Sequence, residues 1–114
     1  MAFFTVSSSA HGTTRVVQAS GELDYRHAPV FRGEMSRIWE AGPPATVVID
    51  VAALTFCDST GVAELIASLR RSNALGSRLV LTGVHGTLAR ILTITGLRAA
   101  FELLPSVEEA LRQP

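Results

Sequence analysis

Asp58, Ser59, Thr60 and Gly61 place two hydroxyl groups between a carboxylate and a glycine, immediately after an apolar run and before a segment with helical periodicity. Aspartate and serine are favoured at helix N-termini, where a side-chain oxygen accepts a free backbone N–H. Either Asp58 or Ser59 could therefore cap a helix. Gly61 needs a separate explanation, because glycine costs a helix stability relative to alanine. Its missing side chain allows another backbone or group to approach closely, so we expect this site to be exposed and approachable.

A serine at a strand-to-helix turn is also the position of the nucleophile in one class of hydrolases. That nucleophile elbow has glycines two residues before and two residues after the serine, and Cys57 occupies the first of these places. A general base would have to be His27 or His85, and a loop position explains each of them equally well. A lone cysteine is usually an inert apolar residue. We therefore predict that the protein is not an enzyme and has no catalytic residues.

Composition restricts the partners further. The chain has 114 residues, and 47% of them are hydrophobic, which is enough for one core and one domain spanning 1–114. Its ten basic residues, all arginine, balance ten acids, so no net field would draw it to nucleic acid or anionic lipid. One cysteine and three histidines give no metal-ligand spacing. We expect no metal, no cofactor and no nucleic-acid partner.

The same reasoning applies to membranes. The longest apolar window, residues 45–56, contains Asp50 and is much shorter than the roughly 20 residues of a membrane-spanning helix. The first nine residues lack the basic region of a secretory signal. The sequence thus predicts a soluble, cytoplasmic protein without membrane insertion.

Periodicity predicts the elements that position the Ser59 segment. Residues 2–8 and 13–20 are rich in Phe, Val and Thr, so they are expected to form a hairpin with a turn at residues 10–12. Apolar residues at helical spacing predict a helix over 27–41, which ends at the Gly-Pro-Pro turn. The β-branched run 46–51 predicts a buried central strand, followed by a short loop to Ser59.

The second half of the chain alternates in the same way. A helix follows Ser59 and is capped by Gly76, residues 78–82 form a strand, and a third helix is closed by Gly96. Residues 100–103 are expected to form an edge strand, and Ser106 with Glu109 a capping box for a helix over 107–112. The predicted fold is α/β: a mixed sheet with helices, in which an N-terminal antiparallel hairpin precedes alternating strands and helices.

Three separate segments resemble one family. Residues 21–24, Gly-Glu-Leu-Asp, resemble its post-strand segment; residues 48–50 with the run Phe-Cys-Asp-Ser-Thr-Gly at 56–61 resemble its phosphorylation loop; and residues 90–97 resemble the end of its third helix. Together they span most of the chain in the right order. On these motifs the chain resembles a stand-alone STAS domain of the anti-sigma factor antagonist type.

The resemblance implies a regulator without catalysis of its own. In such systems the unphosphorylated antagonist binds an anti-sigma factor, usually an ATP-dependent serine kinase, and so releases a sigma factor. The kinase ends the complex by phosphorylating the antagonist, and a phosphatase resets it. Carried over by position, Ser59 is the phospho-acceptor, Asp24 and Asp58 are its acidic neighbours, and Thr60 is a minor or silent hydroxyl. The partner surface then comprises Asp24, Asp58, Ser59, Thr60 and Gly61.

Two other functions remain open from the sequence. One keeps the fold but makes the chain a permanent, non-switching STAS subunit of a lipid-transport or other protein complex, with Ser59 serving only as a cap. The other is a nucleotide-binding module, for which Gly83 and Gly86 around His85 are the only support, because the chain has no phosphate loop.

Overall fold

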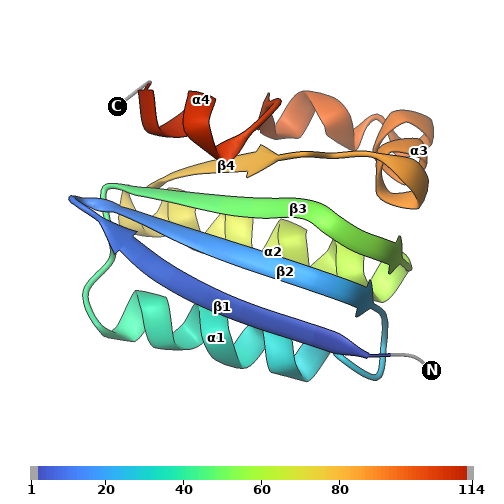
Figure 1. The fold of residues 1–114 in the computed structure, drawn as a ribbon, viewed down its shortest axis with the longest axis horizontal. Helices are drawn as coiled ribbons and strands as arrows, with labels where there is room; N and C mark the ends of the chain where they lie inside the picture. The colour runs from blue at the N-terminus through green and yellow to red at the C-terminus, as the bar shows by residue number, and fades with distance from the viewer. Residues whose placement is uncertain (1–2, 113–114) are drawn as a thin grey trace.

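Five strands form one mixed sheet in the computed structural model, which describes residues 3–112 (Figure 1). They lie side by side in chain order, the first two antiparallel and all later neighbours parallel. The strands are β1 (Phe4–His11), β2 (Thr14–Leu23), β3 (Thr46–Cys57), β4 (Arg78–Thr82) and β5 (Glu102–Leu104). The predicted α/β architecture, with an N-terminal hairpin followed by alternating strands and helices, is confirmed.

Helices cover both faces of the sheet. The main core lies beneath α1 (Ala28–Glu40), α2 (Ser59–Leu75) and α3 (Gly86–Thr95), and Figure 1 shows α1 and α2 running alongside the long strands. On the opposite face, α4 (Val107–Arg112) covers a smaller apolar cluster contributed by β2, β3 and β4. The central β-branched strand is therefore buried on both faces at Val47 and Val48, as its composition predicts.

Most helix ends follow the sequence signals. Gly76 and Gly96 both adopt left-handed backbone conformations as C-caps of α2 and α3, with φ of 73° and 76°. Ser106 accepts the backbone N–H of Glu109 at 3.2 Å, which is the serine half of the predicted capping box. The first helix is one residue shorter at each end than expected, because His27 and Ala41 are its caps.

Two strand boundaries differ from the prediction. The hairpin turn lies at Gly12 and Thr13 and not at residues 10–12, because Ala10 and His11 still pair with β2 and Gly12 supplies the positive φ of 63°. The edge strand expected over 100–103 starts later: a 3₁₀ turn, η1 (Leu97–Ala100), precedes β5.

The largest difference concerns β3, which continues six residues beyond the predicted end at Val51. Its pairing with β4 stops at Asp50, but β2 extends alongside it and pairs Leu23 with Cys57 after a shift in register. The two long strands carry the chain past the end of β4. As a result, the segment that precedes Ser59 is a strand end and not the short loop that the sequence predicted.

Candidate partner-docking site

Ser59 lies at the junction of β3 and α2. β3 ends at Cys57, Asp58 has the extended conformation of a cap residue, and Ser59 is the first residue of the helix. Its side chain is exposed, while Thr60 is half-buried. The hydroxyl is therefore open to solvent at the N-terminal end of a helix of 17 residues.

Asp58 and not Ser59 is the N-cap, which decides between the two possibilities left by the sequence. One carboxylate oxygen of Asp58 accepts the backbone N–H of Gly61 at 2.9 Å, and the other accepts the backbone N–H of Tyr25 at 3.1 Å. The first bond satisfies a free amide of the helix end. The second ties the turn after β2 to the start of α2. The Ser59 hydroxyl is thus not needed for capping.

Gly61 allows a close approach, but the approaching group belongs to the protein itself. The residue is buried, and a Cβ atom on it would lie 2.3 Å from the Leu23 carbonyl oxygen and 2.7 Å from the Cys57 Sγ. The expectation that the whole segment is exposed is therefore wrong at Gly61. This glycine lets α2 begin against the end of β2, which positions its neighbours.

Asp24 follows β2 directly and is buried, with 5% of its surface exposed. Its carboxylate accepts the backbone N–H groups of Arg26 and His27 at 3.0 and 3.2 Å and pairs with the Arg26 guanidinium at 2.9 Å. Burial alone would raise the pKa of this carboxyl, but the hydrogen bonds and charge of Arg26 outweigh it and lower the pKa. Asp24 therefore organises the turn into α1, and Arg26 compensates its charge.

Two exposed aromatic side chains accompany Ser59. Tyr25 is 69% exposed and is tethered to Asp58 through its backbone, and Phe56, the second-to-last residue of β3, is 42% exposed. We call the set Tyr25, Phe56, Asp58, Ser59 and Thr60 the Ser59 surface. Tyr25 and Phe56 are not among the residues that the sequence motifs predict to bind a partner. Their place in the sequence could have indicated such a role: Tyr25 follows the segment 21–24, and Phe56 begins the segment 56–61. Aromatic residues are enriched in protein interfaces.

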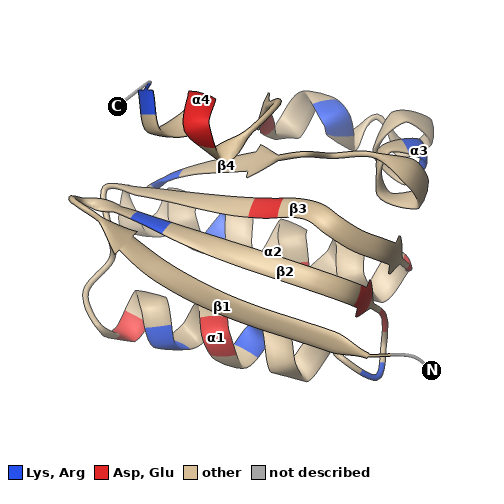
Figure 2. Cartoon of the chain, in the orientation of Figure 1, with Lys and Arg blue, Asp and Glu red and all other residues tan. Residues whose placement is uncertain are grey.

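Acidic residues also lie at the end of the sheet where β2 and β3 finish. Figure 2 shows acidic segments at the carboxyl ends of β2 and β3, which lie next to each other in the sheet. Asp24 and Asp58 follow these strand ends, so the structure brings the two predicted acidic residues to one edge. The Asp24 charge is paired with Arg26. Asp58 is the acidic residue next to Ser59 in the chain.

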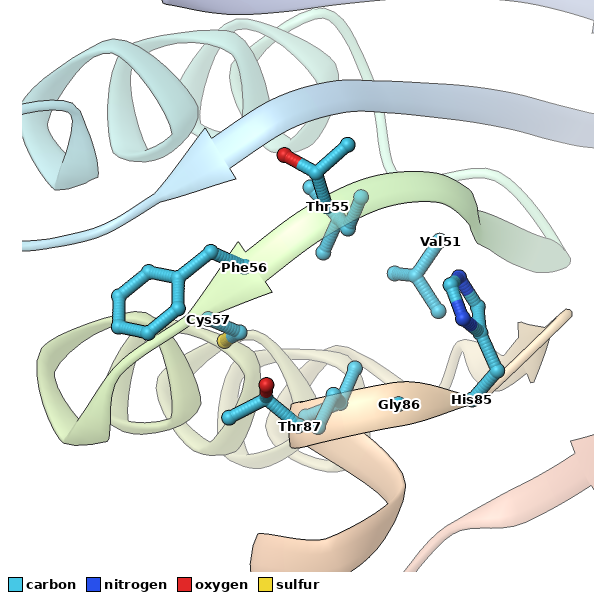
Figure 3. Close-up of a pocket in the computed structure, with 9 residues that line it drawn as sticks. Val51, Thr55, Phe56, Cys57, His85, Gly86 and Thr87 are labelled. Carbon is cyan, nitrogen blue, oxygen red and sulfur yellow. The ribbon is translucent and has the colours of Figure 1, made fainter. Parts of the chain in front are cut away.

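Cys57 and His85 both line a small pocket to which Phe56 also contributes. Figure 3 shows both side chains among its lining residues, between the end of β3 and the start of α3. Burial, with a smaller contribution from Asp58, raises the pKa of the Cys57 thiol to about 12, so the thiol is protonated at neutral pH. The His85 Nε2 lies 2.9 Å from the Ala52 carbonyl oxygen. Within residues 3–112, no group of three metal-ligating side chains is present, and no helix is both long and apolar enough to span a bilayer.

Ser59, preceded by the capping residue Asp58, thus lies at the start of a helix that follows the central strand of a mixed sheet. The STAS domain family model matches residues 6–110, and the chain therefore belongs to the STAS domain family.

Named relatives agree with this assignment. The chain is 27% identical over 84 residues to an anti-sigma F factor antagonist of Lysinibacillus sphaericus, which covers 74% of this chain and 72% of the relative. An anti-sigma factor antagonist from Mycobacterium paratuberculosis superposes with a TM-score of 0.86 at 27% identity, covering 96% of this chain and 92% of that one. The phosphorylated Bacillus cell fate determinant SpoIIAA, at 24% identity, shares the fold with a TM-score of 0.75 over 97% of this chain and 98% of its own.

Proposed function

We propose that this protein is an anti-sigma factor antagonist whose Ser59 surface binds an anti-sigma factor. The observation that carries the proposal is the exposed Ser59 residue at the start of α2, where Asp58 and not Ser59 caps the helix. The exposed aromatic residues Tyr25 and Phe56 add to it. The names of the relatives in two comparisons support it. In this proposal the anti-sigma factor is a serine kinase, and the encounter takes place in the cytoplasm.

Phosphorylation of Ser59 switches the surface off. A phosphate adds about 1.5 to 2 negative charges and three acceptor oxygens. The free amides at the start of α2 stabilise such an anion, so the helix tolerates the modification. The partner meets a different surface, because a bulky dianion now stands on the residue next to Asp58 at the start of α2. The fold persists while docking is lost, and a phosphatase restores binding.

The backbone around Ser59 suits a switch that needs no rearrangement. Asp58 is held by the amides of Gly61 and Tyr25, and its own backbone N–H donates to the Leu23 carbonyl at 3.3 Å. A partner therefore meets a preorganised surface, and preorganisation reduces the entropy lost on binding. The phosphate acts by its charge and size on this fixed surface.

Capture of the binding partner, followed by incubation with ATP, tests the proposal. The tagged chain is used to isolate proteins from its own cells, and the complex is then given Mg-ATP. We expect the intact mass of the chain to rise by one phosphate, fragment mass spectrometry to place it on Ser59, and the complex to dissociate. A partner that transfers no phosphate and stays bound would contradict the switch and favour the permanent-subunit function.

A further inference from the structure

The two edges of the sheet differ in how they are protected. Proteins block exposed sheet edges with short strands, charged residues, prolines or bulges, because an open edge pairs with other strands. β5 has only three residues, and the side chain of Glu102 in it pairs with Arg78. β1 has eight residues, contains no Asp, Glu, Lys, Arg or Pro, and pairs with β2 without any shift in register. None of these protections is present within β1 itself, and the charge beside it belongs to Glu34 of α1, which accepts the Ser8 hydroxyl at 2.8 Å.

The alternating hydrogen-bond pattern between β1 and β2 determines which backbone groups of β1 point away from the sheet. The backbone N–H of Glu22 donates to the Phe3 carbonyl at 2.8 Å, so that pair faces inward. Inward pairs recur at every second residue of an antiparallel ladder. Thr5, Ser7 and Ser9 therefore bond to β2. The intervening residues direct their N–H and C=O groups to the free edge: Phe4, Val6, Ser8 and Ala10.

We propose that β1 pairs with β1 of a second copy of this chain, giving a twofold-symmetric dimer with one continuous ten-stranded sheet. Residues opposite each other in an antiparallel pair lie on the same face, so the residue numbers of each pair must sum to an even number. A sum of 14 pairs Phe4 with Ala10 and Val6 with Ser8, which engages all four outward residues. A shift by two residues in either direction leaves at least one of them unpaired.

In this register, β1 pairs with an identical strand about a twofold axis. The twofold axis passes at Ser7, which faces its own copy in a non-hydrogen-bonded pair with Cα atoms about 4.5 Å apart. Ser7 is exposed and uncharged, so no like charges meet on the axis. A C2 interface requires the same patch to fit itself, and an uncharged, regular strand satisfies that condition. β2 separates β1 from the strand that leads to Ser59, so the dimer leaves the Ser59 surface open.

A charge introduced at Ser7, on the twofold axis, tests the proposed dimer, and analytical ultracentrifugation measures the mass in solution. We expect the wild type to reach twice the chain mass of 12.1 kDa as concentration rises. Ser7→Lys and Ser7→Glu should each sediment as monomers, since like charges then face each other at close range. An equimolar mixture of the two should regain the dimer. A wild type that stays at 12.1 kDa at its highest soluble concentration, or a mixture that stays monomeric, overturns the proposal.

A disulfide provides a second test that does not depend on charge. Ser7→Cys places two thiols within disulfide range across the axis, so oxidation should give a covalent dimer. In the matched control Ser9→Cys, each new thiol faces Thr5 of the other copy, and the two thiols lie roughly 14 Å apart at 3.4 Å per residue. Native Cys57 is buried and does not compete. Equal cross-linking of both variants would show that β1 does not pair in this register. Ser59→Asp should dimerise like the wild type, so the outcome is independent of the switch.

Discussion

The Asp58 carboxylate accepts the backbone N–H of Tyr25 at 3.1 Å, across 33 residues of chain. Its other oxygen accepts the N–H of Gly61 at 2.9 Å, so one side chain holds the turn after β2 and the start of α2 together. This relationship fixes the backbone of Tyr25 relative to the start of α2, where Ser59 lies. It also explains why an aspartate precedes the serine: the acid caps the helix, and the hydroxyl remains free.

Asp58→Ala and Asp58→Asn separate the capping role of this residue from its charge. Alanine removes both hydrogen bonds, so we expect a loss of about 0.5–2 kcal/mol in the free energy of unfolding, the usual value of an N-cap. Asparagine retains a side-chain oxygen acceptor, and its loss should be smaller. Urea unfolding of both variants measures the difference. Equal losses would mean that the charge, and not the cap geometry, stabilises this junction.

Gly61→Ala should destabilise the protein, although alanine is the better helix former. The new Cβ would overlap the Leu23 carbonyl, and overpacking of this kind costs about 1–3 kcal/mol. Gly33→Ala is the matched control: it lies in α1 with no atom within 4 Å of the new Cβ, so it should stabilise by about 0.5–1 kcal/mol. Thermal melts that shift in the same direction for both variants would contradict the close packing at Gly61.

Leu65→Ala tests the contact of α2 with the sheet. Leu65 is fully buried, so truncation should cost about 2–5 kcal/mol. Leu75 belongs to the same helix but is 39% exposed, and Leu75→Ala should cost less than about 1 kcal/mol. Similar midpoints of chemical unfolding for the two variants would show that Leu65 does not face the core.

Acid should weaken the fold partly through Asp24. The folded-state pKa of this carboxyl lies below its ordinary value of 3.8, so its contribution is present above pH 3.8 and is lost as the pH falls through the lower folded-state value. Asp24→Asn removes that titration. We expect the melting temperature of the variant to fall less steeply with pH in this acid range than that of the wild type. Parallel pH profiles would show that Arg26 does not stabilise the ionised carboxyl.

The sequence predicts the elements well where a period or a cap marks them. The apolar stripe of α2 and the C-caps Gly76 and Gly96 are found as expected. The extension of β3 was missed because Ala52 and Ala53 carry no strand signal, and pairing with β2 alone holds that part of the strand. A tertiary contact of this kind leaves no local periodicity.

In the candidate site too, some features follow from local sequence motifs and others depend on long-range contacts. Ser59 and its acidic neighbours follow from short motifs, and the structure places Asp24 and Asp58 at one edge of the sheet. The second hydrogen bond of Asp58, and what fills the space above Gly61, depend on Tyr25 and Leu23, both more than 30 residues away in the chain. Local spacing carries no information about such contacts.

The affinity of the anti-sigma partner for Ser59 variants tests the central claim most directly. Because Asp58 provides the cap, Ser59→Ala should change the free energy of unfolding by less than about 0.5 kcal/mol, and it should bind the partner even after incubation with ATP. Ser59→Asp places an acid in the first turn, which α2 tolerates, so its melting temperature should match that of the wild type. Calorimetry should show at least a tenfold weaker complex for Ser59→Asp, equivalent to about 1.4 kcal/mol. Equal affinity of a folded Ser59→Asp chain and the wild type would contradict the claim that Ser59 is a binding switch.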